Sequence, residues 1–226
     1  MWLDATDIRD FYASPLGCVT SQIIENYVRG LWPNVAGMNV LGIGFPGPYL
    51  NNFSNEAKRM IVAMPVSRGN LHWPDTELNK TCLTVEAELP LPDLSVDRVI
   101  IIHTLEFTET VRPMMREVWR VLSETGRVII IVPNRRGIWT RLEHTPFGYG
   151  HPYSSSQLSR LLFDNMFTPI TTRGLLHVPP SSSRLIHSAA SPWETIGRRW
   201  FSAFGGIIST EAKKQIYSGA LQGEKG

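Results

Sequence analysis

The apolar positions of the chain form short continuous runs that are bounded by Gly or Pro. Four such runs lie at 38–44, 59–65, 97–105 and 127–132, and a weaker one lies at 81–89. Continuous apolar runs of this length are typical of strands that are buried on both faces of a parallel sheet.

Apolar positions with helical spacing lie between these runs. One stretch, with Thr20 or Ser21 as its expected cap, covers the part of 14–31 that precedes the first run. A second stretch carries one apolar stripe along Val111, Met114, Met115, Val118, Trp119 and Leu122. Gly126 follows this stripe, and we expect it to form a turn before the run at 127–132.

Strands that alternate with helices predict an α/β fold with crossover helices on both faces of a parallel sheet, which is a three-layer sandwich. The later part of the chain adds a helix at 154–167 and strands at 168–178 and 205–217. A length of 226 residues suits one large domain. We therefore expect a single domain over residues 1–226, with an N-terminal helical lid at about 7–31 and inserted cap segments at about 133–154 and 179–204.

The first strand runs into a glycine-rich loop, "VLGIGFPG", whose glycines fit the spacing G-x-G-x-x-G. Such a loop holds a dinucleotide, holds another adenosine ligand, or is a plain turn. Pro46 and Pro48 each remove a backbone N–H that a pyrophosphate would need. The second strand ends in Met64 and Pro65, where a dinucleotide site places an acid for the ribose. The loop therefore disfavours a nicotinamide oxidoreductase.

Composition narrows the classes further. A net charge of +2 with 42% hydrophobic residues describes a globular protein and gives no sign of nucleic-acid binding. Two cysteines indicate neither a disulfide framework nor a metal site. The acidic start "MWLDATDIRD" does not resemble a signal peptide, and the apolar runs are too short to span a membrane. We expect a cytoplasmic location.

Four stretches together resemble the class I S-adenosylmethionine-dependent methyltransferases, in particular the methyltransferase type 11 branch. They are "VLGIGFPG", "EAELPLPDLSVDRVIIIHTLE", "MMREVWRVLSETGRVIIIVPN" and the closing "GGIISTEAKKQIY". The resemblance implies a Rossmann-like methyltransferase fold with a mostly parallel seven-stranded sheet. It also implies that S-adenosylmethionine is the cofactor and that its methyl group goes to a small or lipid-like acceptor.

The resemblance assigns cofactor contacts position by position. Tyr12 is our candidate for a lid residue over the cofactor, because related folds close such a segment over it. The other implied cofactor-binding residues are Gly42, Gly44, Phe45, Gly47, Met64, Pro65, Glu86 and His103.

The segment 133–154 leaves the end of the fifth expected strand, so we expect it to overhang the pocket. Its aromatic and basic side chains, Phe147, Tyr149 and Arg135, are candidates for contact with the acceptor. Three histidines, His103, His144 and His151, are candidates for accepting a proton during catalysis.

One departure from the family pattern leaves a second hypothesis open. The family has an acid at the end of the second strand that binds both ribose hydroxyls, and this chain has none there. The alternative is a non-catalytic methyltransferase-like binding or scaffolding protein with weak or no cofactor binding. It would have a protein partner and an apolar patch that includes Trp193, Trp200, Phe201 and Phe204.

Overall fold

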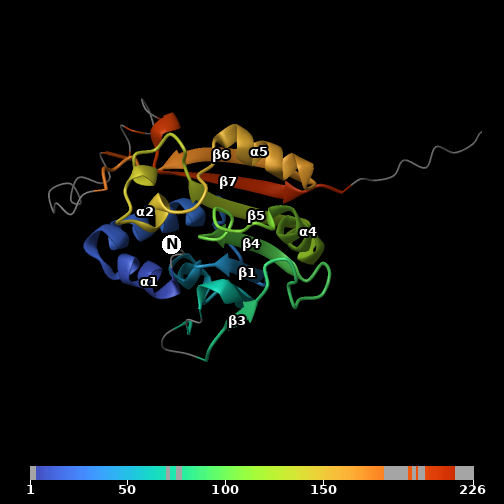
Figure 1. Cartoon of the computed structure of the whole chain (residues 1–226). Helices are drawn as coiled ribbons and strands as arrows, with labels where there is room; N and C mark the ends of the chain where they lie inside the picture. Colours follow the sequence, from blue (N-terminus) through green and yellow to red (C-terminus); the bar gives the residue numbers. More distant parts are fainter. Residues whose placement is uncertain are drawn as a thin grey trace, which may run out of the picture.

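A computed structural model describes residues 4–69, 72–74, 78–180, 193–194, 197 and 202–216. Its helices and strands follow one another along the chain as shown in Figure 1: α1 (Ala5–Ala13), α2 (Pro15–Leu31), β1 (Asn39–Gly44), α3 (Gly47–Leu50), β2 (Arg59–Pro65), β3 (Thr81–Thr84), β4 (Val96–Ile102), α4 (Val111–Val121), β5 (Leu122–Pro133), α5 (Ser155–Asp164), β6 (Phe167–Leu175) and β7 (Ile207–Lys214). Short 3-10 turns include η3 (Trp139–Arg141) and η4 (Pro146–Gly148).

The described strands form one 7-stranded sheet in the order β3-β2-β1-β4-β5-β7-β6. The strands β3, β2, β1, β4 and β5 run parallel to one another. β7 is antiparallel to both of its neighbours, β5 and β6. The mostly parallel seven-stranded sheet that the resemblance implied is therefore confirmed. β1 lies between β2 and β4, so the loop that follows it emerges near the middle of the sheet.

Alternate residues of each central strand enter different cores. Val40, Val62 and Ile100 pack in a cluster with the buried residues of α1, α2 and α3. Leu41, Ile101 and the apolar stripe of α4 pack in a second cluster with α5 on the opposite face. Because both faces of the central strands are covered by helices, the domain is a three-layer sandwich, as the continuous apolar runs predict.

The helix before β1 is longer than the sequence pattern predicts. α2 begins at Pro15, and the Ser14 side chain accepts a hydrogen bond from the backbone N–H of Gly17. The expectation that Thr20 or Ser21 caps it is wrong. The Thr20 hydroxyl instead donates to the carbonyl of Leu16 one turn earlier, which lets a buried threonine sit inside a helix.

The turn expected at Gly126 is also wrong. β5 already begins at Leu122, which pairs with Val96 ahead of a register shift in the ladder. A Cβ at Gly126 would lie 2.7 Å from the Leu122 side chain and 2.8 Å from the Ser123 carbonyl oxygen. Glycine is therefore needed there for close packing inside the strand.

α1 packs closely on the start of α2. A Cβ at Gly17 would lie 1.9 Å from the carbonyl oxygen of Phe11. Asp4 caps α1 reciprocally with Asp7, so the helix has a fixed start. Most of the expected cap segment 179–204 lies outside the described residues. Within the described part of the chain, the structure contains no helix with the length and apolar character needed to cross a bilayer.

Candidate functional site

The glycine loop after β1 is held against the end of β4. Gly44 has a φ of +91°, and a Cβ there would lie 2.1 Å from both the Ile102 carbonyl oxygen and the Thr104 hydroxyl. The backbone N–H of Phe45 donates to the same Ile102 carbonyl at 3.1 Å. Glycine is required at this position both by conformation and by space.

The loop then folds back over its own strand. A Cβ at Gly42 would lie 2.2 Å from the Pro46 ring, so the first proline of "GFPGP" packs directly on β1. The helix that follows, α3, has only four residues and carries Pro48 in its first turn. Such a short helix offers no N-terminal anion site, which is consistent with the expectation that the loop does not hold a pyrophosphate.

A pocket of about 500 Å³ opens beside this loop. Its floor is formed by the loop and the side chains of Val62 and Met64 from β2, and its walls come from α1, α2 and the segment after β2. The described lining residues are Arg9, Tyr12, Ala13, Glu25, Phe45, Pro46, Gly47, Pro48, Asn51, Asn52, Val62, Met64, His72 and Trp73.

The structure brings together some of the predicted cofactor residues and separates others. Tyr12, Phe45, Gly47 and Met64 line the pocket. Gly42 and Gly44 are buried beneath it, where they shape the loop. Pro65 ends β2 and is buried, and Glu86 follows β3 in a half-exposed position; neither is among the described lining residues.

Two pocket residues that sequence reasoning missed are Trp73 and Glu25. The Trp73 ring lies over Gly47, where an added Cβ would come within 2.8 Å of it. Glu25 projects from α2 and is the carboxylate among the described lining residues. Its Oε1 accepts a hydrogen bond from the Ser21 hydroxyl at 2.6 Å, and its Oε2 accepts one from the Asn52 amide at 3.4 Å.

Tyr12 connects the pocket to the end of β4. Its ring stacks on Phe45 with an angle of 3° between the planes and 5.7 Å between the centroids. Its hydroxyl lies 2.9 Å from Nε2 of His103 and accepts a hydrogen bond from the Tyr49 hydroxyl at 2.6 Å. Burial raises the pKa of both Tyr12 and Tyr49 above the ordinary value, so both phenols stay protonated near neutral pH.

His103 occupies the position immediately after β4 and is buried. Its φ of +55° is unusual for a residue with a side chain. The ring lies 4.9 Å, between centroids, from Phe147 of η4. Phe147 also contacts the rings of Phe11 and Trp139, so the overhanging segment and α1 meet above His103.

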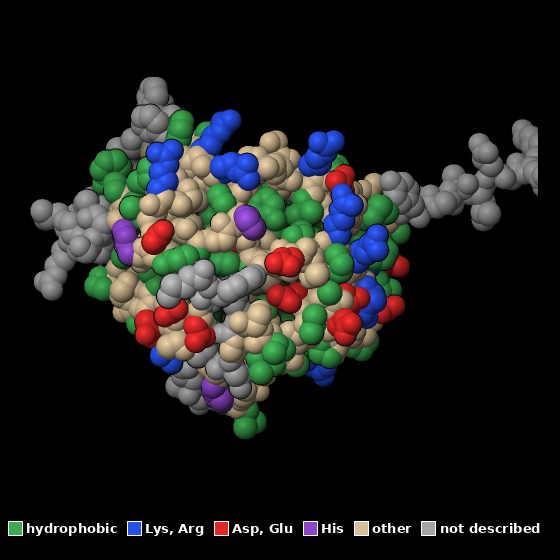
Figure 2. Space-filling model, in the orientation of Figure 1, with side chains coloured by type: hydrophobic (Ala, Val, Ile, Leu, Met, Phe, Trp, Pro, Cys, Tyr) green, Lys and Arg blue, Asp and Glu red, His purple; other side chains and the backbone are tan. Residues whose placement is uncertain are grey.

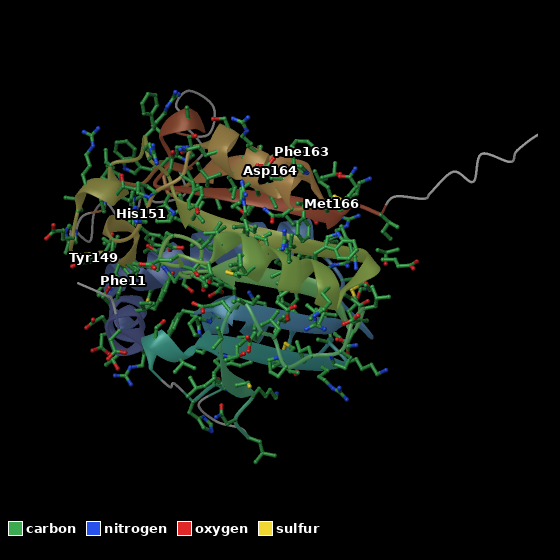
Figure 3. All side chains as sticks on the ribbon, turned by 45° about the vertical axis from the view of Figure 1, so that its right-hand side comes forward. Phe11, Tyr149, His151, Phe163, Asp164 and Met166 are labelled. Carbon is green, nitrogen blue, oxygen red and sulfur yellow. The ribbon has the colours of Figure 1, made fainter. Side chains whose placement is uncertain are left out.

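The other predicted acceptor residues lie farther toward the surface. His144, His151 and Arg135 are exposed, and Tyr149 is half-buried. Figure 3 shows Tyr149 and His151 near the same end of the molecule as Phe11. The guanidinium of Arg135 donates to the Pro152 carbonyl at 3.1 Å, which ties together the two ends of this segment. None of these four is among the described residues that line the pocket.

The comparisons with known proteins agree with this architecture. Residues 40–130 match a family described as a methyltransferase domain. A probable S-adenosylmethionine-dependent methyltransferase of Mycobacterium tuberculosis is 29% identical over 171 residues, which cover 69% of this chain and 61% of that protein. The match thus spans less than two thirds of the length of that relative.

Solved structures share the fold. An S-adenosylmethionine-dependent methyltransferase of Thermotoga maritima superimposes with a TM-score of 0.64 at 16% identity, covering 92% of this chain and 94% of the other. A Burkholderia thailandensis N1-methyltransferase with bound 1,6-didemethyltoxoflavin and S-adenosylhomocysteine superimposes with a TM-score of 0.59 at 14% identity, covering 92% and 82%. At these identities the likeness concerns the fold. The family match over residues 40–130 confirms the resemblance to class I methyltransferases of type 11.

Proposed function

We propose that this protein is an S-adenosylmethionine-dependent methyltransferase. The proposal starts from the match of residues 40–130 to the methyltransferase domain family. The observation that carries the proposal is the pocket of about 500 Å³ beside the glycine loop. Its volume falls in the range of small-molecule sites, and it lies beyond the carboxyl ends of parallel strands, where open α/β sheets bind ligands.

The lining fits an adenosine ligand that carries no phosphate. The two prolines leave the loop with few free N–H donors, which suits a nucleoside better than a pyrophosphate. Trp73 supplies an aromatic face for the adenine or for the positively charged sulfonium. When bound, S-adenosylmethionine would supply an electrophilic methyl group at its sulfur.

Glu25 supplies a carboxylate to the pocket, whereas the end of β2 has no acidic residue. The ribose has two hydroxyls that donate hydrogen bonds, and a carboxylate with two oxygens can accept both. Glu25 lines the pocket from α2, and its side chain is anchored by Ser21 and Asn52. We assign the ribose contact of this protein to Glu25 in place of the missing strand-end acid.

The acceptor is a small or lipid-like molecule in this proposal. The end of β4 is covered by α1 and by Phe147, which favours an enclosed acceptor site with apolar walls. The face shown in Figure 2 carries both signs of charge, with Lys and Arg mainly along its upper and right-hand side, so it presents no uniform basic track for a nucleic acid. A segment of about 7–31 acts as lid and 133–154 as cap within one domain.

A non-catalytic binding protein is the second candidate. The same two prolines and the absence of an acid after β2 support it. In the expected apolar patch, Trp193 is 43% exposed and Phe204 is 57% exposed, whereas Trp200 and Phe201 lie outside the described residues. This function would require a protein partner, for which half-exposed aromatic side chains are suitable contacts.

A cytoplasmic location is part of the proposal, supported by the free thiols of Cys18 and Cys82.

Isothermal titration calorimetry of the folded chain with S-adenosylmethionine and S-adenosylhomocysteine tests the proposed function. Saturable binding of both supports a methyltransferase. Absence of heat at millimolar ligand, together with capture of a protein partner, supports the alternative.

A further inference from the structure

Four titratable side chains form a buried chain at the end of β4. The hydroxyl of Tyr49 donates to that of Tyr12, and the Tyr12 hydroxyl lies 2.9 Å from Nε2 of His103. On the far side of the imidazole, Nδ1 of His103 lies 3.5 Å from Oε1 of Glu106. His103 and Glu106 are each about 1% exposed, so both side chains lie in the protein interior.

The hydrogen bond that Tyr49 donates to Tyr12 favours one direction for the remaining contacts of this row of side chains. Tyr49 donates its proton to the oxygen of Tyr12, so the Tyr12 proton is free to point toward His103. Nε2 then accepts and carries no proton, which places the ring proton on Nδ1, facing Glu106. In this arrangement the Tyr49 and Tyr12 protons point at acceptors, and the Nδ1 proton faces the Glu106 carboxyl group without a hydrogen bond to it.

Glu106 is the unusual member of the chain. Among the described residues, neither of its side-chain oxygens has a hydrogen-bond partner, and Oε1 lies 3.5 Å from Nδ1 of His103. A buried carboxylate without hydrogen bonds costs stability, so packing does not explain its presence. Next to an imidazole, such a carboxylate fixes the tautomer and stabilises the positive charge that forms when Nε2 takes a proton.

We propose that this row of buried side chains is a binding site for a phenolic hydroxyl. The methyl acceptor is then an aromatic hydroxyl compound, and the reaction is an O-methylation. In this structure the site is filled by the phenol of Tyr12. The acceptor takes its place when α1 moves, with its ring flat on Phe45 and its hydroxyl between Tyr49 and His103. This inference rests on the proposed function and extends it to the acceptor.

The roles follow from the geometry. His103 is the catalytic base: its Nε2 takes the hydroxyl proton while the oxygen forms its bond to the methyl carbon. The bond from that carbon to sulfur breaks, and its electron pair remains on sulfur. Glu106 is a positioning residue that holds the Nδ1–H tautomer. Phe45 belongs to the glycine loop and lines the pocket, so an acceptor ring on it lies beside the cofactor pocket.

A binding experiment tests the hydroxyl site without turnover. Tyr12→Ala removes the resident phenol, and p-cresol and toluene then differ only in the hydroxyl that the site recognises. We expect p-cresol to bind at least about tenfold more tightly than toluene by NMR titration. Glu106→Gln added to this variant should remove most of that difference without changing toluene binding, whereas Glu109→Gln, in the exposed loop nearby, should leave it intact. Equal affinities for both ligands would overturn the proposal.

An activity assay of the wild-type protein is a second test, and it does not depend on the stability of the variants. With labelled S-adenosylmethionine, simple phenols should yield methyl ethers, and anilines and thiols of the same shape should yield at least about tenfold less product. Methyl transfer confined to nitrogen, sulfur or carbon acceptors would overturn the phenol site but leave the methyltransferase function in place. A chain that does not bind S-adenosylhomocysteine fails at the earlier step, so the two failures are distinguishable.

Discussion

The Tyr12 hydroxyl lies 2.9 Å from Nε2 of His103, although the two residues are 91 positions apart in the sequence. This contact joins the N-terminal helix α1 to the end of the central strand β4, directly above the glycine loop. Removing the hydroxyl leaves Nε2 of His103 and the Tyr49 hydroxyl without their buried partner. We expect Tyr12→Phe to lower the free energy of unfolding by about 1–3 kcal/mol. Urea unfolding measures this, with Tyr149→Phe, a half-buried tyrosine, as the control that changes little.

Glu25 should determine how the protein recognises the ribose. Glu25→Gln keeps the shape of the side chain and removes its charge, so we expect affinity for S-adenosylhomocysteine to fall by about 10- to 100-fold, the value of a charged hydrogen bond. The wild type should also bind the 2′-deoxy analogue less tightly than the parent, and the variant should lose this preference.

The matched control for this prediction is Glu56→Gln. Glu56 forms an ion pair with Arg29, which lies on α2 like Glu25. Glu56 is not among the described lining residues of the pocket. It should change stability and leave ligand discrimination unchanged. If Glu25→Gln retains the full preference for the 2′-hydroxyl, then Glu25 is not the ribose contact.

Two glycines of α2 should respond in opposite directions to the same substitution. Gly17→Ala places a methyl group against the Phe11 carbonyl, 1.9 Å away, so it should destabilise the protein by about 1–3 kcal/mol and loosen α1. A Cβ at Gly30 meets nothing within 4 Å, so Gly30→Ala should stabilise the protein by about 0.5–1 kcal/mol.

Thermal unfolding and hydrogen exchange of the α1 amides check this pair. Faster exchange in α1 for Gly17→Ala, with normal exchange in β1 and β4, is the expected pattern. Uniformly faster exchange throughout the sheet would show that α1 is not a separate lid.

An acid-dependent contribution to stability should come from Glu117. Its carboxylate accepts hydrogen bonds from the Arg120 guanidinium and from the backbone N–H of Leu89, and these hold its pKa below the ordinary value of 4.5. A carboxyl whose pKa is lowered by folding stabilises the protein above its unfolded pKa, and this stabilisation is lost as the pH falls through the folded pKa.

Glu117→Gln should therefore cost about 1–2 kcal/mol at pH 7, and the difference from wild type should shrink as the pH falls below 4.5. Urea unfolding at pH 7 and pH 3.5 measures it. Glu124→Gln, an exposed position beyond the same helix, should show no such convergence. A Glu117→Gln deficit that is equal at both pH values would rule out this linkage.

Local patterns in the sequence sufficed to predict most of the fold. The apolar runs of β1, β2, β4 and β5 and the stripe of α4 report burial on both faces of a sheet, because each strand needs its own continuous apolar side chains. The start of α2 and the turn at Gly126 could not be predicted in this way. Ser14 caps a helix whose first turns lack an apolar stripe. Gly126 lies inside β5, near the register shift that follows the pairing of Leu122 with Val96, and this pairing is a tertiary contact.

The site was predictable only where it is local. The family resemblance implied Phe45, Gly47 and Met64 through the loop and the end of the second strand, and all three line the pocket. Glu25, Trp73 and Glu106 come from elements that carry no motif, and they reach the site through tertiary packing. The proximity of Tyr12 to the site was expected because related folds close this segment over the cofactor. Its contacts with Tyr49 and His103 could be found only in the structure.

The central claim is that the pocket beside the glycine loop binds S-adenosylmethionine. Met64 lines that pocket, whereas Met115 is buried in the core on the opposite face of the sheet. Titration of methyl-labelled methionine protein with S-adenosylhomocysteine, followed by NMR, tests the claim most directly. The account predicts a saturable shift of the Met64 signal with little change at Met115. Saturable binding that leaves the Met64 signal unmoved, or no binding at millimolar ligand, would contradict it.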